Sequence, residues 1–552
     1  MANKKSKART KVRDVDTVGG ERPPKATPRL YPRVRLLNRF YEPLVLLSVL
    51  GRTRGEHLRA NLPRGSNLDQ WSIKHVRRLF LFKAAYLCDF RKGGDTVTAM
   101  AIEGRPEGKI IWVASNTSPE PKIIPFMQEL LSRLSRADET DADVERRVDD
   151  AAKFCIGFAS HRIKNYASFI CSKIEKCKSL FERRPLQNSK YMPLFRWLEN
   201  FMRLRDSYFK LCRFAYDQRR CGEMKLLEEL CKEPDFHPDQ DSFHFHFKML
   251  RHYVGRLGHH IKAVKMLVLC MPRLSNLFDG IKIRPIPTPS SFEVPLTDDM
   301  TNIDRIVIRL LPSGSEQVAH YQRTLQEMDT KFKVMDRFME KYQDPNLKPR
   351  VHAEVQVAAF FENRQLRFED SDPFIASSKP SCYCCFLYFR RHHPNFVTPP
   401  AHQNIHLNWG LPDFQDDIKQ RDILNSMIPD IRRDLLDQID QKQPNLFMHP
   451  DSTTGITESL MDLSDEAMSV LDSDDSSVFD RNSGRCSADE SSRSLLTDIV
   501  DSESIETSSR PLNDDEDITA TADWLGQLQV NDDDGASDDN WQDSSDGGGV
   551  PL

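Results

Sequence analysis

The chain is 552 residues long, 39% hydrophobic and 29% charged, so it can bury a large core as one elaborated domain of about 400 residues plus tails. Its net charge of −4 is unevenly distributed: residues 451–552 hold 27 acidic and 4 basic side chains, a net of −23, and residues 1–450 carry +19. The apolar stretch 41–50 is too short and interrupted to span a bilayer, and the cysteines show no compact disulfide framework. These features exclude membrane-spanning and small disulfide-rich secreted proteins, and we expect a cytoplasmic or nuclear protein.

Residues 1–30 are predicted to form a disordered basic arm, whose basic run at 4–11 fits either a nuclear address or an arm that contacts RNA. A dense group of arginines follows it, namely Arg33, Arg35, Arg39, Arg52, Arg54, Arg77 and Arg78. Such side chains either bind phosphates or form ordinary solvated helix faces. The basic body favours a polyanionic partner, either nucleic acid or a nucleotide.

Residues 31–116 are predicted to hold helices followed by a β-hairpin. The segments 96–103 and 109–116 are rich in β-branched residues, and the turn-forming sequence 104–108 separates them. Asn116 ends the second predicted strand, a position where asparagine commonly has a turn role. We therefore expect two antiparallel strands early in the fold.

Residues 117–345 are predicted to form a mostly helical insertion. Apolar residues recur at three- and four-residue spacing, with basic residues between them, in the segments 151–181, 191–216 and 243–274. A proline-rich break at 285–295 precedes one more amphipathic helix at 316–342. The cysteines of this region lack ligand spacing and are predicted to be buried reduced thiols: Cys155, Cys171, Cys177, Cys212, Cys221, Cys231 and Cys270.

The most informative motif lies in residues 346–450. His352 and Glu354 form a His-x-Glu pair, and a Cys-x-x-Cys pair, Cys382 and Cys385, begins 30 residues after the histidine. His352 and the two cysteines would fill three corners of a tetrahedral Zn²⁺ site and leave the fourth open for water, as a catalytic site requires. Zinc lowers the pKa of such a water to about 7. Glu354 is then free to take the water's proton and pass it to a departing amino group.

The flanks of this motif predict how its residues are held. The apolar run 355–361 fits a buried helix, 374–377 a short strand, and 386–391 a second helix that ends near His392. A Cys-x-x-Cys pair at a loop-to-helix junction lies near the positive end of a helix dipole, which favours thiolates. Cys384 should point away from a metal held by its two neighbours. Residues 346–450 are therefore predicted to be a zinc-binding core.

These residues resemble the nucleic-acid and nucleotide deaminase superfamily, and most of all its OTT-type branch, the toxin-related deaminases expanded in fungi. The resemblance rests on the segments 351–356 and 375–385, which read Val-His-Ala-Glu-Val-Gln and Ile-Ala-Ser-Ser-Lys-Pro-Ser-Cys-Tyr-Cys-Cys. Ser381 stands directly before the first cysteine, where the superfamily usually has proline and this branch tends to carry serine. The resemblance implies an α/β, cytidine-deaminase-like three-layer fold, with a mixed sheet flanked by helices and the large helical insertion within it.

The resemblance also implies a function and its residues. The reaction would be a zinc-dependent hydrolytic deamination of cytosine or adenine in nucleic acid or a nucleotide. Zn²⁺ would be bound by His352, Cys382 and Cys385, with Glu354 as the catalytic proton shuttle. Asn116 would contact the substrate, and a plain turn role at the strand end remains its alternative.

Three interpretations from different classes remain open. The first is an active zinc deaminase, and the second is a catalytically silent binding protein that keeps the fold and the zinc. The third is a structural zinc site that takes Cys384 or His406 as its fourth ligand. Glu354 argues against the third interpretation, because a structural site has no need of a carboxylate beside the metal. His392, His393, His402 and His406 either line the substrate pocket or are ordinary hydrogen-bonded histidines.

Residues 451–552 are predicted to be a disordered acidic tail, rich in Ser, Asp and Gly. A short amphipathic segment at 522–530 within it suits docking on a protein partner, and a purely solvating tail is the alternative. The opposite charges of tail and body also suggest that the tail competes with nucleic acid for the basic surface.

Overall fold

A computed structural model of the chain describes residues 31–63, 68–135, 141–183, 191–230, 243–412 and 417–445. The predicted basic arm and the predicted acidic tail lie outside these residues, and so does Cys231. None of the helices in the described ranges is long and apolar enough to cross a bilayer. The cysteines described there are free thiols, as predicted, and all of them are buried except Cys221, which is partly exposed.

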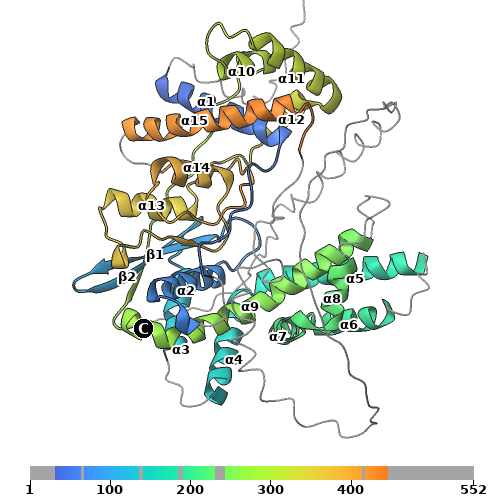
Figure 1. Cartoon of the computed structure of the whole chain (residues 1–552), viewed down its shortest axis with the longest axis vertical. Coiled ribbons are helices and arrows are strands. Elements are labelled where there is room, and N and C mark those ends of the chain that lie inside the picture. Colours follow the sequence, from blue (N-terminus) through green and yellow to red (C-terminus); the bar gives the residue numbers. More distant parts are fainter. Residues whose placement is uncertain are drawn as a thin grey trace, which may run out of the picture. The chain divides into compact units, whose positions relative to one another are not determined.

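A four-stranded mixed sheet organises the fold (Figure 1). Its strands are β1 (Thr98–Arg105), β2 (Gly108–Ser115), β3 (Lys282–Pro285) and β4 (Ala376–Ser377), in the spatial order β3-β2-β1-β4. β1 runs antiparallel to both β2 and β4, and β3 runs parallel to β2. The predicted hairpin and the strand before the cysteines are confirmed, but Arg105 pairs with Gly108, so the turn has two residues rather than five. Gly108 has a φ of 130°, which favours glycine there.

The sheet is buried on both faces, because its apolar residues alternate between two cores. Met100, Ile102, Ile111 and Val113 join one core. Ala99, Ala101, Ile110, Trp112 and Ala114 join the other. Period-two alternation sends neighbouring side chains to opposite faces, so an apolar residue at nearly every position produces a sheet with helices on both sides.

The helices of the second core carry the predicted motif. They are α1 (Pro32–Leu50), α10 (Ile303–Leu310), α11 (Val318–Phe332), α12 (Val334–Tyr342), α13 (Ala353–Asn363), α14 (Tyr383–His392) and α15 (Asp417–Asp440). α13 packs directly on β1 and β2, and α14 contacts both α13 and α15. The helices predicted around the motif are confirmed.

One predicted helix, 316–342, is two helices in the structure. Lys333 separates α11 from α12 in a left-handed conformation, with a φ of 54°. The Asp329 carboxylate accepts a hydrogen bond from the backbone N–H of Met335 at 2.6 Å, which satisfies a donor at the start of α12. The helical spacing of apolar residues continues through Lys333, so the sequence pattern did not predict that one helix ends and another begins there.

The helices of the first core lie on the other side of the sheet. They are α2 (Ile73–Cys88), α3 (Ile123–Leu134), α4 (Asp141–Phe158), α5 (Ser160–Arg183), α6 (Tyr191–Leu204), α7 (Tyr208–Asp217), α8 (Gly222–Leu230) and α9 (Phe243–Phe278). Of these, α2 and α3 contact the strands of the sheet. Short 3-10 turns lie at Leu68–Gln70, Gln218–Arg220 and Glu369–Ser371. α9 contacts α2, α4, α5, α7 and α8 and is the centre of this layer. The segment predicted as an insertion also supplies β3, so it is part of the sheet itself.

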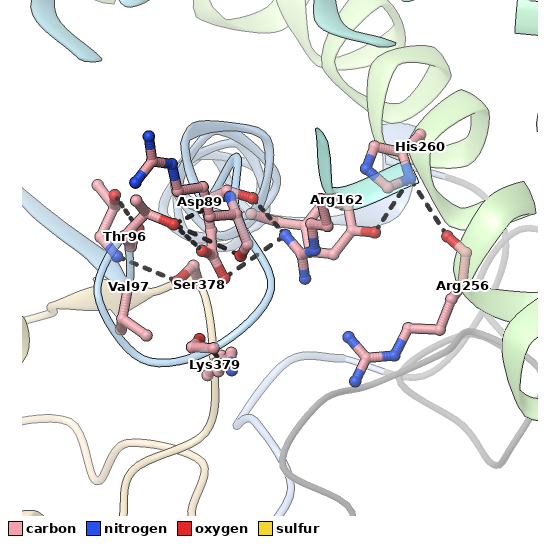
Figure 2. Close-up of polar contacts among 12 residues, drawn as sticks. Asp89, Thr96, Val97, Arg162, Arg256, His260, Ser378 and Lys379 are labelled. Atoms are coloured by element: carbon pink, nitrogen blue, oxygen red, sulfur yellow. Dashed lines mark hydrogen bonds and ion pairs between the residues drawn. The ribbon is translucent and has the colours of Figure 1, made fainter. Parts of the chain in front are cut away.

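A buried polar network joins the helical layer to the start of β1 (Figure 2). Arg162 of α5 is 1% exposed, and its guanidinium donates to the backbone carbonyl of Asp89 after α2. The same group lies 3.5 Å from the Asp89 carboxylate, whose other oxygen accepts from Thr96 Oγ1 at 2.7 Å. A residue of the insertion therefore orders the loop 89–97 that leads into the first strand.

Stability should fall in acid because of His260, which lies in this interior. Burial, reinforced by the charge of Arg162, lowers the pKa of His260 to about 3. The unfolded chain takes up a proton below about pH 6.5, whereas the folded chain takes it up only near pH 3. The free energy of unfolding therefore falls between these pH values, by about 2 kcal/mol from this group at pH 5.

The measurement is urea unfolding at pH 7.5 and pH 5 of the wild type and of His260→Gln. The variant should lose less stability on acidification than the wild type, by about 2 kcal/mol. His161→Gln, at an exposed position on α5, is the matched control and should keep the wild-type dependence. Equal pH dependence in His260→Gln and the wild type would contradict the prediction.

Candidate metal centre and active site

His352, Cys382 and Cys385 come together where two helices begin. His352 is the N-cap of α13, Cys382 is the N-cap of α14, and Cys385 lies in the first turn of α14. The Nδ1 atom of His352 is 3.6 Å from the Sγ atom of Cys382 and 3.3 Å from that of Cys385. Both cysteines are buried and the histidine is partly exposed. The three side chains form a group that we call the metal group.

The geometry of the metal group fits zinc. Tetrahedral zinc with ordinary bond lengths to sulfur and nitrogen separates these two ligand atoms by about 3.5 Å. The two sulfur-to-nitrogen distances, 3.6 and 3.3 Å, lie close to that value. Among the described residues the group has three members, and neither Cys384 nor His406 belongs to it. Three protein ligands leave one tetrahedral position for a small molecule, as in catalytic zinc sites.

The metal group combines one thiolate with two side chains that keep their protons while no metal is bound. Burial raises the pKa of Cys382, but its hydrogen bond with Cys385 and the charge of His352 outweigh burial, and the pKa lies well below its usual range. Burial lowers the pKa of His352, yet Cys382 raises it, and the net direction is upward. Burial and the neighbouring Cys382 hold the pKa of Cys385 well above its usual range. Zinc would displace the remaining protons, because it binds thiolates and neutral imidazole.

Glu354 lies beside the metal group in the first turn of α13 and is 4% exposed. Burial raises the pKa of its carboxyl group, His352 opposes this, and the net direction is upward. The Glu354 carboxyl and the Cys385 thiol are hydrogen-bond partners. Glu354 is not a member of the metal group, although its carboxyl group lies next to the ligands. This position suits proton transfer.

Asn116 joins the end of β2 to the start of α13. Its Oδ1 accepts from the backbone N–H of Ala353 at 2.8 Å, and its Nδ2 donates to the carbonyl of Gly94 at 2.7 Å. Its partner Ala353 lies between His352 and Glu354, so Asn116 contacts the chain directly between these two residues. Its predicted substrate contact stays a prediction, and its structural role is to position the start of α13, which carries His352 and Glu354.

Sequence reasoning missed the ties that hold the two halves of the motif together. Lys379, three residues before Cys382, donates from Nζ to the carbonyl of Gly93 at 2.9 Å. Arg350, two residues before His352, pairs with Asp95 at 2.8 Å. Both partners lie in the loop 89–97, so one loop anchors both segments that carry metal ligands. The only sequence signal was the charge of these two residues beside the motif.

Two of the arginines grouped as a basic region have an internal role. Arg77 and Arg78 are 3% and 4% exposed and contact the buried carboxylate of Asp372. The Nη2 atom of Arg78 donates to Asp372 Oδ1 at 2.6 Å, and Arg77 also pairs with Asp370. Their guanidinium groups connect α2 to the segment before β4. Because both are buried, they are not accessible to nucleic acid.

His392 and His393 lie away from the metal group, at the other end of α14. His392 is 3.1 Å from a Glu362 carboxylate oxygen, and His393 is 3.9 Å from the same atom. These three residues also fit the ligand spacing of a metal site. However, Lys419 Nζ lies 3.0 Å from the other oxygen of Glu362 and already supplies a positive charge there. We interpret this cluster as an ionic tie among α13, α14 and α15.

The structure has the mixed sheet flanked by helices that the resemblance implied, with a histidine and two cysteines at the starts of two of the helices. In agreement, residues 351–413 match the model of a deaminase family, described as OTT_1508-like deaminase. The matched segment contains His352, Glu354, Cys382 and Cys385. No curated protein and no solved structure matched the chain. The toxin-related and fungal part of the predicted resemblance stays a prediction.

Proposed function

We propose that this protein is a zinc-dependent hydrolase that removes the amino group of cytosine or adenine in nucleic acid or a nucleotide. The observation that carries the proposal is the buried carboxyl group of Glu354 next to three ligand atoms at zinc-like separations. The match of residues 351–413 to a deaminase family supports the same reaction class. A purely structural zinc site would have no use for that carboxyl group.

His352, Cys382 and Cys385 would hold the zinc ion. When bound, zinc supplies Lewis acidity and lowers the pKa of a coordinated water to about 7. Glu354 accepts a proton from the attacking water and donates it to the amino nitrogen that departs as ammonia. The overall exchange replaces the C–NH₂ of the base by C=O, with one water consumed and one ammonia released.

The test is to purify the full chain, quantify bound zinc, and incubate it with single-stranded RNA, single-stranded DNA, nucleosides and nucleotides. Each substrate is supplied with cytosine and with adenine, and the product bases are identified by mass. A gain of about one dalton on one base would establish deamination and name the substrate class. Bound zinc without turnover on any substrate would favour the binding-protein interpretation, and absence of zinc would contradict the proposed metal site.

Replacing a cysteine of the metal group should abolish zinc binding. Cys385→Ser is expected to reduce bound zinc from about one per chain to near zero and to lower the thermal midpoint, because metal binding contributes to folding. Cys384→Ala is the matched control, since Cys384 is buried one position away but lies outside the metal group. The control should retain zinc. Equal zinc content in the two variants would overturn the ligand assignment.

A further inference from the structure

The loop 89–97 contacts both halves of the metal site through two neighbouring backbone carbonyls. The Gly93 carbonyl accepts from Lys379 Nζ at 2.9 Å, on the segment that leads to the cysteine pair. The Gly94 carbonyl accepts from Asn116 Nδ2 at 2.7 Å, and Oδ1 of the same side chain accepts from the first backbone N–H of α13 at 2.8 Å. The path of this loop therefore affects where the histidine and the cysteines lie.

A buried carboxylate closes the base of the loop. Asp89 and Thr96 lie near its two ends, and they are 0% and 3% exposed. Thr96 Oγ1 donates to Asp89 Oδ1 at 2.7 Å and accepts from the backbone N–H of Arg91 at 3.0 Å. Because these groups are buried, their hydrogen bonds are stronger than they would be in water. They fix the distance between the two ends of the loop.

Arg162 of α5 holds the same carboxylate from the helical layer (Figure 2). Its guanidinium donates to the Asp89 backbone carbonyl and lies 3.5 Å from Asp89 Oδ2, the oxygen that does not accept from Thr96. Arg162 is itself fixed, because its Nε donates to the Tyr166 hydroxyl at 2.7 Å, and Arg256 of α9 donates to that hydroxyl at 3.0 Å. A chain of buried polar contacts thus runs from α9 through α5 to the loop.

Metal affinity depends on such support. Ligand atoms must be held to within about 0.5 Å of their productive positions, and losing a residue that orients a ligand typically weakens metal binding about 10–100-fold. We propose that Arg162 is a positioning residue for the metal group. It fixes the loop 89–97, and the loop fixes the segments that carry His352, Cys382 and Cys385. The helical layer therefore controls the affinity of the site for zinc. This inference rests on the zinc binding that the proposed function requires, but not on deamination itself.

The test measures the zinc affinity of the full chain by competition with a chelating dye. The absorption spectrum of the Co²⁺-loaded protein is recorded in parallel, because it reports the geometry of the ligands. Arg162→Met removes the charge and the donors that hold Asp89, so it should weaken zinc binding at least about tenfold and change the Co²⁺ spectrum. Arg162→Lys, which can still donate to Asp89, should restore part of the affinity.

Thr96 supplies a second pair of variants, which decides the question if Arg162→Met does not fold. Thr96→Val keeps the shape of the side chain but removes the hydroxyl that closes the loop, so it should also weaken zinc binding at least about tenfold. Thr96→Ser keeps the hydroxyl and should retain the wild-type affinity and Co²⁺ spectrum.

Glu42→Gln is the control for lost stability. Glu42 is 1% exposed and pairs with Arg309, so this variant also disrupts a buried ion pair, but one whose partner lies on α10. It should keep the wild-type zinc affinity. Wild-type affinity in folded Arg162→Met or in Thr96→Val, or an equal loss in Glu42→Gln, would overturn the inference. If zinc affinity depends on Arg162 but the wild type deaminates no substrate, the positioning role stands and the deaminase proposal fails.

Discussion

Replacing Glu354 by glutamine is expected to lower the rate of deamination by about 10²–10⁴-fold while leaving zinc content unchanged. Glutamine has nearly the shape of glutamate, but its amide cannot accept the proton of the attacking water. Glu354 lies outside the metal group, so its replacement should not remove a zinc ligand. The measurement compares kcat on the identified substrate with the zinc stoichiometry of the same preparation.

The control for this prediction is Glu327→Gln, an exposed carboxylate on α11. It should retain wild-type kcat and zinc. If Glu354→Gln keeps more than about a tenth of the wild-type rate, Glu354 is not the proton shuttle. If the variant loses zinc in proportion to activity, the carboxyl group supports the metal rather than the chemistry.

Replacing Asp372 by alanine is expected to cost about 3–5 kcal/mol of folding free energy, because it leaves two buried guanidinium groups without their shared carboxylate. The Asp372 side chain is 2% exposed and accepts from Arg78 at 2.6 and 3.0 Å. Burial raises its pKa, but Arg78 outweighs burial, and the net pKa is lowered. With a total stability of about 5–15 kcal/mol for a typical folded domain, this loss is measurable by urea unfolding.

The structure offers a matched control for this pair of ions. Asp370 also pairs with Arg77, but its side chain is 62% exposed. Asp370→Ala should therefore cost no more than about 1 kcal/mol, as for other exposed ion pairs. Similar losses in the two variants would show that burial does not determine the strength of this network.

Asp372 precedes β4, so the Asp372→Ala variant should also bind zinc less tightly.

The elements of the fold differ in how well local pattern predicted them. The hairpin β1–β2 and the helices α13 and α14 were predictable, because each is a short element with strong periodicity or turn chemistry of its own. β3 was not predicted. Its four residues, Lys282–Pro285, are half-exposed and carry little apolar pattern, and they become a strand only because β2 offers an unpaired edge. Pairing between strands that are distant in the sequence depends on the tertiary structure, so the β-propensity of a local segment does not predict it.

The metal group was predictable because ligand chemistry restricts it to few residue types at narrow spacing. Its supports were not, since Asn116, Gly94 and Asp95 lie far from the motif in the chain and carry no metal-ligand signature. Likewise, sequence reasoning grouped Arg77 with exposed arginines, although its guanidinium is buried against Asp372. A count of basic residues cannot separate a surface charge from an internal ion pair.

By itself, the sequence determined the chemistry that this protein can carry: one histidine, one carboxylate and two cysteines whose spacing suits zinc and proton transfer. It also determined the mixed α/β class, because apolar alternation and helical periodicity are local properties of the chain. Only the tertiary structure decided how the site is held. The loop 89–97 contacts both motif segments, because folding joins segments that the sequence holds hundreds of residues apart.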